Sequence, residues 1–424
     1  MGPPPPAVIE FGRAHVPSPL RAKSLRFGRP GSWALVLAAC LLPLAACSGS
    51  PKEGVRTSTG LGPSASTPSV APSPSPNPSS RPISAPSPSA TALPTDLEVQ
   101  STSWISATVG WILGWAPCAS SASGCTLLDH STDGGTTWNS LPVPAISLMS
   151  PSGSRYRVRF ADALDGWIWG SQVWATHDGG STWTQVSSLT GSVGDLEATS
   201  GYAYALVANA SGGSTLWRTP AALDSWVQMH VPESASSASL SVQNGDAWLL
   251  EELPAASGGG LVSSLFAFAS GITPTREYNA PCGPGLVDAA TASTIWVVCA
   301  SNGAAGSEAK AVYLSTNGGA FLASAGQPPA PGDLAAVAGA GVSALVVSAC
   351  SGSSILYSTI DSGSTWNTAL TLNDGGQCFA DLQFPGPGLA VAISGTPWGH
   401  SSGGPVPTMY RSQDGGAIWA PLAR

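Results

Sequence analysis

The sequence predicts an all-β protein whose globular part is built from repeats of four antiparallel strands. Only 9% of its 424 residues are charged, whereas Gly (50 residues), Pro (38) and Trp (16) are abundant. Helices require many Glu, Lys, Arg and Leu residues, so this composition disfavours them. Short runs rich in Ser, Thr and Val alternate with turn residues about every ten positions, which is typical of strands.

A short motif with an acidic or amide residue, glycines and a Trp recurs along the chain. Its clear copies are STDGGTTW (131–138), THDGGSTW (176–183), TIDSGSTW (359–366) and SQDGGAIW (412–419), and a weaker copy, STNGG (315–319), lacks the Trp. The third residue of each copy is predicted to accept backbone hydrogen bonds in a tight turn, while the glycines allow a positive φ. The residues in this structural role are Asp133, Asp178, Asn317, Asp361 and Asp414.

A second repeated phrase, an apolar strand that begins near an aromatic residue, precedes each motif. It occurs seven times, with Gly110-Trp111 and Gly166-Trp167 as the clearest examples. Positions 133 to 414 divide into six intervals of about 47 residues, which suits a four-stranded propeller blade. We therefore expect a seven-bladed β-propeller over residues 96–424 whose third and fourth blades have lost the motif. Six or eight blades are the alternatives.

The repeated motif resembles the Asp box, or BNR repeat, of sialidase-like β-propellers, and the Gly-Trp phrase most resembles the photosystem II assembly-factor-like propellers, which are non-catalytic. The sialidase resemblance implies arginines from several blades, a Tyr–Glu nucleophile pair and a catalytic Asp. Residues 96–106 of the expected first blade contain no Arg. Arg218 and Arg411 fall beside the motif turns, away from the ring axis where the family's arginines lie. We therefore predict no catalytic residues and a module that binds an envelope protein or a glycan. A sialidase-like exo-glycoside hydrolase is the alternative.

The N-terminal residues are predicted to be a lipoprotein signal. Five basic residues precede an apolar run over 33–46, which is too short to span a membrane. The run ends in Leu44-Ala45-Ala46-Cys47, which resembles a bacterial lipobox and implies lipidation of Cys47 after cleavage of residues 1–46. A similar Leu-Ala-Ala-Cys sequence ends at Cys40, but an apolar segment follows it. An ordinary secretory signal with an incidental Cys is the alternative.

Residues 47–95 are predicted to be a disordered tether, because 11 prolines lie among Ser, Thr and Ala between 48 and 95. The mature chain would carry 11 basic and 23 acidic residues, a net charge of −12. Such a surface disfavours nucleic acid as a partner. We expect a monomer, anchored by its lipid on the outer face of the bacterial cytoplasmic membrane.

The remaining cysteines are expected to form disulfides, as is usual in exported domains. They all fall at the blade ends opposite the motif turns. We expect pairs within blade 1, within blade 5, and between blades 6 and 7: Cys118–Cys125, Cys282–Cys299 and Cys350–Cys378.

Four residues are candidates for ligand binding. Arg155, Arg157 and Arg159 alternate on the expected inner strand of blade 2 and share one side of it. They could bind an acidic group near the ring axis; the alternatives are a solvated edge or cross-blade ion pairs with Asp162 and Asp165. Trp398 lies in a long loop on the face that carries the cysteines. No cofactor or metal site is predicted, since no ligand spacing occurs.

Overall fold

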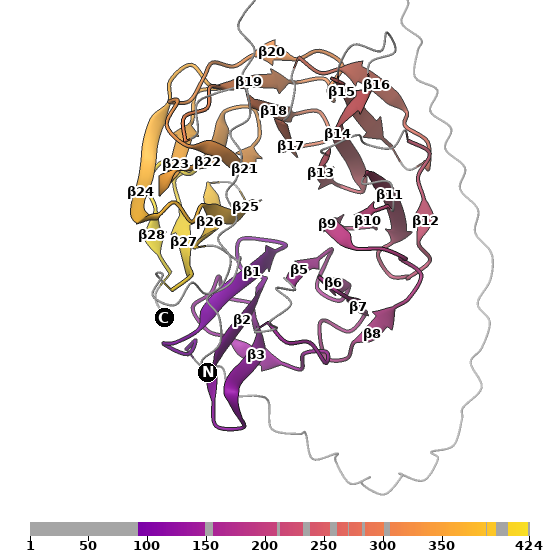
Figure 1. Ribbon diagram of the computed structural model, residues 1–424, viewed down its shortest axis with the longest axis vertical. Coiled ribbons are helices and arrows are strands. Elements are labelled where there is room, and N and C mark those ends of the chain that lie inside the picture. The colour runs from indigo at the N-terminus through magenta and orange to yellow at the C-terminus, as the bar shows by residue number, and fades with distance from the viewer. Residues whose placement is uncertain are drawn as a thin grey trace, which may run out of the picture. The chain divides into compact units, whose positions relative to one another are not determined.

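The computed structural model confirms a seven-bladed β-propeller (Figure 1). It describes residues 92–148, 156–209, 213–231, 238–254, 261–269, 271–281, 285–300, 306–386, 388–395 and 406–422. The described residues form seven four-stranded antiparallel sheets and no helix. The described part of the chain therefore contains no helix that could cross a membrane. The predicted signal, Cys47 and all but the last few tether residues lie outside the described residues.

The first four blades contain strands β1 to β16. Blade 1 comprises β1 (Glu98–Trp104), β2 (Gly110–Cys118), β3 (Ser121–Ser131) and β4 (Asn139–Leu141). Blade 2 comprises β5 (Arg157–Phe160), β6 (Gly166–Trp169), β7 (Val173–Thr176) and β8 (Thr184–Val186). Blade 3 comprises β9 (Val193–Thr199), β10 (Tyr202–Ala208), β11 (Ser214–Pro220) and β12 (Val227–Gln228). Blade 4 comprises β13 (Ala238–Gln243), β14 (Asp246–Pro254), β15 (Leu261–Phe268) and β16 (Arg276–Asn279).

The last three blades contain strands β17 to β28. Blade 5 comprises β17 (Gly285–Ala289), β18 (Ile295–Ala300), β19 (Lys310–Ser315) and β20 (Ala323–Ser324). Blade 6 comprises β21 (Asp333–Ala340), β22 (Ala344–Cys350), β23 (Gly352–Thr359) and β24 (Asn367–Gly375). Blade 7 comprises β25 (Phe379–Gly386), β26 (Leu389–Ser394), β27 (Thr408–Ser412) and β28 (Ala420–Pro421). In every sheet each strand pairs with the next along the chain.

The second strand of each blade is apolar because both of its faces are covered. β18 and β22 are buried over almost their whole length, and neighbouring blades supply the cover. This explains why these strands read as continuous apolar runs rather than alternating ones. The hydrophobic core is therefore divided into clusters that lie between adjacent sheets.

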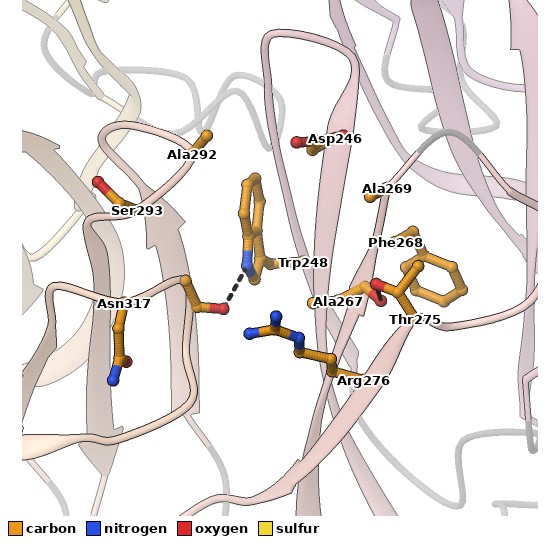
Figure 2. A pocket seen from close by; sticks show the side chains of 11 residues that line it. Asp246, Trp248, Ala267, Phe268, Ala269, Thr275, Arg276, Ala292, Ser293 and Asn317 are labelled. Carbon is orange, nitrogen blue, oxygen red and sulfur yellow. Dashed lines mark hydrogen bonds between the residues drawn. The ribbon is translucent and has the colours of Figure 1, made fainter. Parts of the chain in front are cut away.

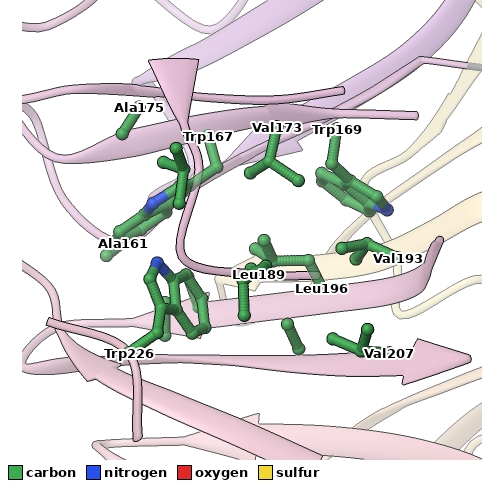
Figure 3. Close-up of a cluster of buried hydrophobic side chains, with 14 of the residues drawn as sticks. Ala161, Trp167, Trp169, Val173, Ala175, Leu189, Val193, Leu196, Val207 and Trp226 are labelled. Atoms are coloured by element: carbon green, nitrogen blue, oxygen red, sulfur yellow. The ribbon is translucent and has the colours of Figure 1, made fainter. Parts of the chain in front are cut away.

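The interface between blades 2 and 3 illustrates this packing (Figure 3). Trp167 of β6 and Trp226, which precedes β12, meet edge to face with ring centroids 6.2 Å apart. Small aliphatic side chains such as Val193 and Leu196 of β9 fill the space beside them. Tightly packed aromatic pairs of this kind are among the largest contributors to core stability.

The inner strands have one unpaired edge, and side chains of the preceding blade satisfy it. The hydroxyl oxygen of Ser101 in blade 1 accepts a hydrogen bond from the Val158 N–H in blade 2. Ser103 accepts one from the Phe160 N–H in the same way. Ser239 and Ser241 of blade 4 likewise accept hydrogen bonds from the backbone N–H groups of Val287 and Ala289 in blade 5. Since a lone donor in a buried position is costly, these contacts fix the register between blades.

The same device closes the ring between blades 7 and 1. The carboxylate of Asp381 accepts the Thr102 N–H at 2.9 Å and the Ser101 hydroxyl at 2.6 Å. The Gln383 amide accepts the Trp104 N–H at 3.0 Å and donates to the Thr102 carbonyl at 2.9 Å. The terminal sheet consists of β25 to β28 alone, so residues near Asp96 do not add a strand to it. Closure rests on these bonds and on apolar packing between the two blades.

A serine in the blade 6 motif occupies a backbone conformation that glycine holds in the other copies. Ser362 has φ 60°, whereas Gly134, Gly179, Gly318 and Gly415 stand at the equivalent positions with φ between 73° and 78°. A left-handed conformation costs a residue with a Cβ about 1–2 kcal/mol, and the extra freedom of an unfolded glycine offsets part of this. We expect Ser362→Gly to raise the free energy of unfolding by about 0.5–1 kcal/mol.

Chemical denaturation measures this gain, and the reverse substitution is its control. A Cβ added at Gly415 would lie 3.8 Å from the nearest side-chain atom, that of Ile360, so Gly415→Ser tests the backbone conformation without a clash. It should destabilise the protein by a similar amount. A neutral Gly415→Ser together with a destabilising Ser362→Gly would contradict the explanation.

Candidate functional site

In all five motif turns a side-chain oxygen of the third residue accepts the backbone N–H four residues further on, and three turns add a hydroxyl bond. Asp133 accepts the Thr137 N–H at 2.8 Å and the Thr137 hydroxyl at 2.7 Å, and Ser131 donates to it. These bonds, that of the backbone N–H first, lower the pKa of Asp133 to about 2. Asp178 and Asp361 repeat the pattern with Thr182 and Thr365.

Two motif turns keep only part of this pattern. Asn317 accepts the Phe321 N–H at 3.0 Å, and Asp414 accepts the Ile418 N–H at 2.9 Å. Phe321 and Ile418 stand where the other turns have a Thr, and their exposed fractions are 69% and 72%. In each of the five turns the side-chain oxygen is held by neighbouring N–H groups, which leaves it poorly placed for acid–base chemistry.

The third blade lacks the acidic turn residue but keeps the tryptophan, which the sequence analysis missed. Trp226 is 7% exposed and directly precedes the outer strand β12, as Trp138 precedes β4. The spacing could have indicated Trp226, because it follows Trp183 by 43 residues, close to one blade length. No DGG sequence precedes it, so the motif did not identify it. In blade 4 the same position is held by Thr275.

The described cysteines lie at one end of the blades, which we call the loop face. At this end the second strand of a blade connects to the third, and each blade connects to the next. The opposite end, with the motif turns, is the turn face. Cys118–Cys125 braces the β2–β3 connection, and Cys350–Cys378 joins blade 6 to blade 7, as predicted. Cys299 is also disulfide-bonded, and its expected partner Cys282 lies outside the described residues.

The arginines on the inner strand of blade 2 have different surroundings. The guanidinium of Arg159 is buried, donates to Glu197 of β9 at 2.8 Å and also donates to the Thr102 carbonyl at 3.1 Å. Arg157 is half-buried, and Arg155 lies outside the described residues, as does Trp398.

The alternative of ion pairs with Asp162 and Asp165 does not hold for Arg159, which pairs with Glu197. Asp162 accepts backbone N–H groups of its own turn. Asp165 pairs with His177 at 2.7 Å instead. The reason is that inner-strand side chains turn toward the adjacent blades, so Arg159 meets a carboxylate of blade 3.

Three carboxylates surround these cations near the ring axis. Asp195 and Glu197 on β9 and Asp381 on β25 all interact electrostatically with Arg159. Burial raises the pKa of Glu197 to about 7, although the Arg159 charge opposes the change. Burial also raises the pKa of Asp195, against the charges of Arg157 and Arg159. Arg159 therefore links blade 2 to blades 1 and 3, and ligand binding by the arginines of this strand stays a prediction.

Two further arginines, which lie beside the motif turns, connect neighbouring blades through hydrogen bonds. Arg218 of β11 donates to the Gly271 carbonyl at 2.9 Å, and Arg411 of β27 donates to the Gly134 carbonyl at 2.8 Å. Each bond reaches from one blade to the turn face of the next. No group of three His, Cys, Asp or Glu residues in the described part of the chain is placed to hold a metal ion.

A pocket opens on the turn face between blades 4 and 5 (Figure 2). Its volume is about 380 Å³, and its polar lining includes Asp246, Thr275, Arg276, Ser293 and Asn317. The Trp248 indole forms part of its wall and donates to the Gly318 carbonyl of blade 5 at 3.2 Å. The sequence assigned Asn317 to its motif turn and indicated none of the other residues, because they come from separate positions in two blades.

Comparisons with known proteins find similarity in structure only. No protein-family model and no curated protein matches the sequence. Among solved structures, YCF48 bound to a D1 peptide matches with a TM-score of 0.48 and 18% identity, covering 77% of this chain and 96% of that one. YCF48 from Cyanidioschyzon merolae matches with a TM-score of 0.47 and 15% identity, covering 77% and 98%.

Other matched propellers belong to enzymes. The β-propeller domain of the trilobed protease from Pyrococcus furiosus, described as having an open velcro topology, matches with a TM-score of 0.46 and 8% identity, covering 78% of this chain and 97% of that one. An ulvan lyase of a polysaccharide lyase family matches with a TM-score of 0.45 and 10% identity, covering 79% and 97%. At these identities the likeness concerns the fold, which serves binding proteins and enzymes alike.

Proposed function

We propose that this protein is a lipid-anchored binding module that presents its loop face to a protein or a glycan of the bacterial cell envelope. The observation that carries the proposal is the pair of disulfides on that face. They hold the β2–β3 connection of blade 1 and the junction of blades 6 and 7 in fixed positions. Loops fixed in advance lose little conformational entropy when a partner binds.

The use of the charged side chains supports a non-catalytic role. The motif carboxylates accept hydrogen bonds inside their turns, and the buried Arg159 is occupied by Glu197 and a backbone carbonyl. A sialidase-like reaction needs arginines that are available to a substrate carboxylate, a Tyr–Glu nucleophile pair and a catalytic Asp. Arg159, Arg218 and Arg411 instead join neighbouring blades, and the motif acids stabilise their own turns.

The anchor would place the propeller outside the cytoplasmic membrane. Diacylation of Cys47 supplies two hydrocarbon chains, which is about what stable membrane attachment requires. The Pro/Ser/Thr-rich residues after it would act as a semi-extended spacer.

Substitution of Cys47 tests the proposed lipidation and the attachment to the membrane. We expect the full chain expressed in a bacterium that processes lipoproteins to incorporate a fatty-acid analogue, and Cys47→Ala to abolish the label and release the protein from the membrane fraction. Cys40→Ala is the matched control and should label like the wild type. Undiminished labelling of Cys47→Ala would exclude this site.

Site-specific photo-crosslinking in cells tests the binding face. A crosslinking amino acid at the exposed Ser351, in the β22–β23 turn of the loop face, should capture a specific protein or glycan. The same group at the exposed Gln413, on the turn face of blade 7, should not. Capture from Gln413 alone would contradict the assignment of the face, and hydrolysis of fluorogenic sialosides by the purified protein would contradict the non-catalytic role.

A further inference from the structure

The pocket on the turn face is formed by the strand register of blade 4 (Figure 2). Trp248 of β14 lies opposite Ala267 of β15, which in turn lies opposite Arg276 of β16. Paired residues of an antiparallel sheet project on the same side, so these three side chains face blade 5 together with Asp246, two residues before Trp248. The small Ala267 and Ala269 leave the space between Asp246, Trp248 and Arg276 open.

Two opposite charges face this space without neutralising one another. Within the described residues, Arg276 makes only a 3.2 Å hydrogen bond with the Tyr278 hydroxyl, and no ion pair joins it to Asp246. The side-chain carboxylate of Asp246 has no hydrogen-bond partner among those residues either. Burial raises the pKa of this carboxyl group. A cation beside Asp246 would replace water that burial has partly removed, and an anion beside the exposed Arg276 would form charge-assisted hydrogen bonds.

The tryptophan in the wall does not provide a stacking platform. Trp248 is only 3% exposed, and its N–H is engaged by Gly318. Stacking of a sugar ring needs an open aromatic face, so the charged groups must supply most of the recognition. Ser293, Thr275 and Asn317 add hydrogen-bonding groups at the rim.

From this geometry we propose that the pocket between blades 4 and 5 binds a short zwitterionic peptide, with its ammonium group at Asp246 and its carboxylate at Arg276. Two strand spacings and two residues of rise separate the Cα atoms of Asp246 and Arg276 by about 12 Å. The two side chains project on the same side of the sheet, so a hydrogen bond of about 3 Å at each end leaves a gap of about 6 Å, which an extended dipeptide, about 7 Å long, spans. A volume of about 380 Å³ lies at the lower end of the range for small-molecule pockets and suits a ligand of this size.

This pocket is separate from the loop face, so the inference goes beyond the proposed function and does not depend on it. Ligands of the loop face would leave Asp246 and Arg276 accessible, since these residues lie on the turn face.

Calorimetric titration of the purified full chain with L-alanyl-L-alanine at pH 7 tests the proposal. Two derivatives each remove one charge: N-acetyl-L-alanyl-L-alanine lacks the ammonium group, and L-alanyl-L-alaninamide lacks the carboxylate. A charge-assisted hydrogen bond contributes enough that each loss should weaken binding about tenfold or more.

Variants assign each charge to its partner. Arg276→Gln should bind the dipeptide about tenfold more weakly and no longer distinguish it from the amide, and Asp246→Asn should no longer distinguish it from the acetylated form. Asp96→Asn, an exposed acid outside the pocket, is the control and should bind like the wild type. Thermal unfolding checks that every variant is folded. Absent binding, equal affinity for all three ligands, or unchanged affinity in both pocket variants would overturn the proposal.

Discussion

Replacing Asp381 with glycine is expected to lower the free energy of unfolding by about 3 kcal/mol, because it leaves two partly buried donors of blade 1 without an acceptor. The Ser101 hydroxyl and the Thr102 N–H both donate to this carboxylate. Asp381 has φ 47°, a conformation that glycine adopts without strain, so the substitution removes the carboxylate and adds no backbone cost. Alanine at this position would confuse the two effects.

The neighbouring Gln383 should have a comparable effect. Its amide makes two bonds to the backbone of β1, as a paired strand would. Gln383→Leu keeps the size of the side chain and removes both bonds, and we expect a loss of about 2 kcal/mol. Denaturant unfolding measures the loss, and hydrogen exchange of the Thr102 and Trp104 amides shows whether the junction of blades 7 and 1 opens first.

An interface inside the ring provides the matched control. Ser241 accepts the Ala289 N–H across the junction of blades 4 and 5, where the chain itself connects the two blades. Ser241→Ala should cost about 1 kcal/mol and leave exchange at the 7–1 junction unchanged. If Asp381→Gly costs no more than Ser241→Ala and the Thr102 amide stays protected, apolar packing of residues such as Trp104, Val391 and Ile393 closes the ring by itself.

The sequence predicted the features that local chemistry determines. The motif turns need an acceptor, glycines and a following strand within eight residues, so Asp133 and Asp178 could be assigned their role directly. The blade count followed from their spacing, even across the two blades without the motif. The disulfides Cys118–Cys125 and Cys350–Cys378 followed from the expected ends of the strands.

Contacts between blades could not be predicted, because they depend on how neighbouring sheets are offset. Arg159 was correctly placed on an inner strand, but its partner Glu197 lies 38 residues away on the next blade. Asp381 meets Ser101 across 280 residues. The pocket of Asp246 and Arg276 has the same origin, since it exists only where the register brings two alanines between them.

The stability of the propeller is expected to fall as the pH rises from about 5 to 8. Glu251 of β14 is 1% exposed and lies on the side of the strand that faces the apolar interface with blade 3. Neither carboxylate oxygen has a hydrogen-bond partner within the described part of the chain. Burial accordingly raises its pKa to about 8. Burial also raises the pKa of Asp288 to about 7, against the hydrogen bond from the Gly339 N–H.

The sign follows from the proton balance of the two states. Above about pH 4.5 the unfolded chain releases the Glu251 proton, whereas the folded protein retains it up to about pH 8. Each such group therefore lowers the free energy of unfolding by up to about 1.4 kcal/mol per pH unit in this window. His177 acts in the same direction: its bonds to Asp165 and Asp224 outweigh the opposing effect of burial and raise its pKa, and the stabilisation by its charge is lost as the pH rises.

Glu251→Gln isolates the largest of these contributions. The amide keeps the shape of the side chain and does not ionise, so the variant should match the wild type near pH 5 and exceed its stability by about 3 kcal/mol at pH 8. Glu277→Gln, an exposed residue of β16, is the control and should keep the wild-type pH dependence. Denaturant unfolding at several pH values measures both. A wild-type stability that stays level or increases between pH 5 and 8 would mean that the carboxyl group of Glu251 is hydrated or paired in solution.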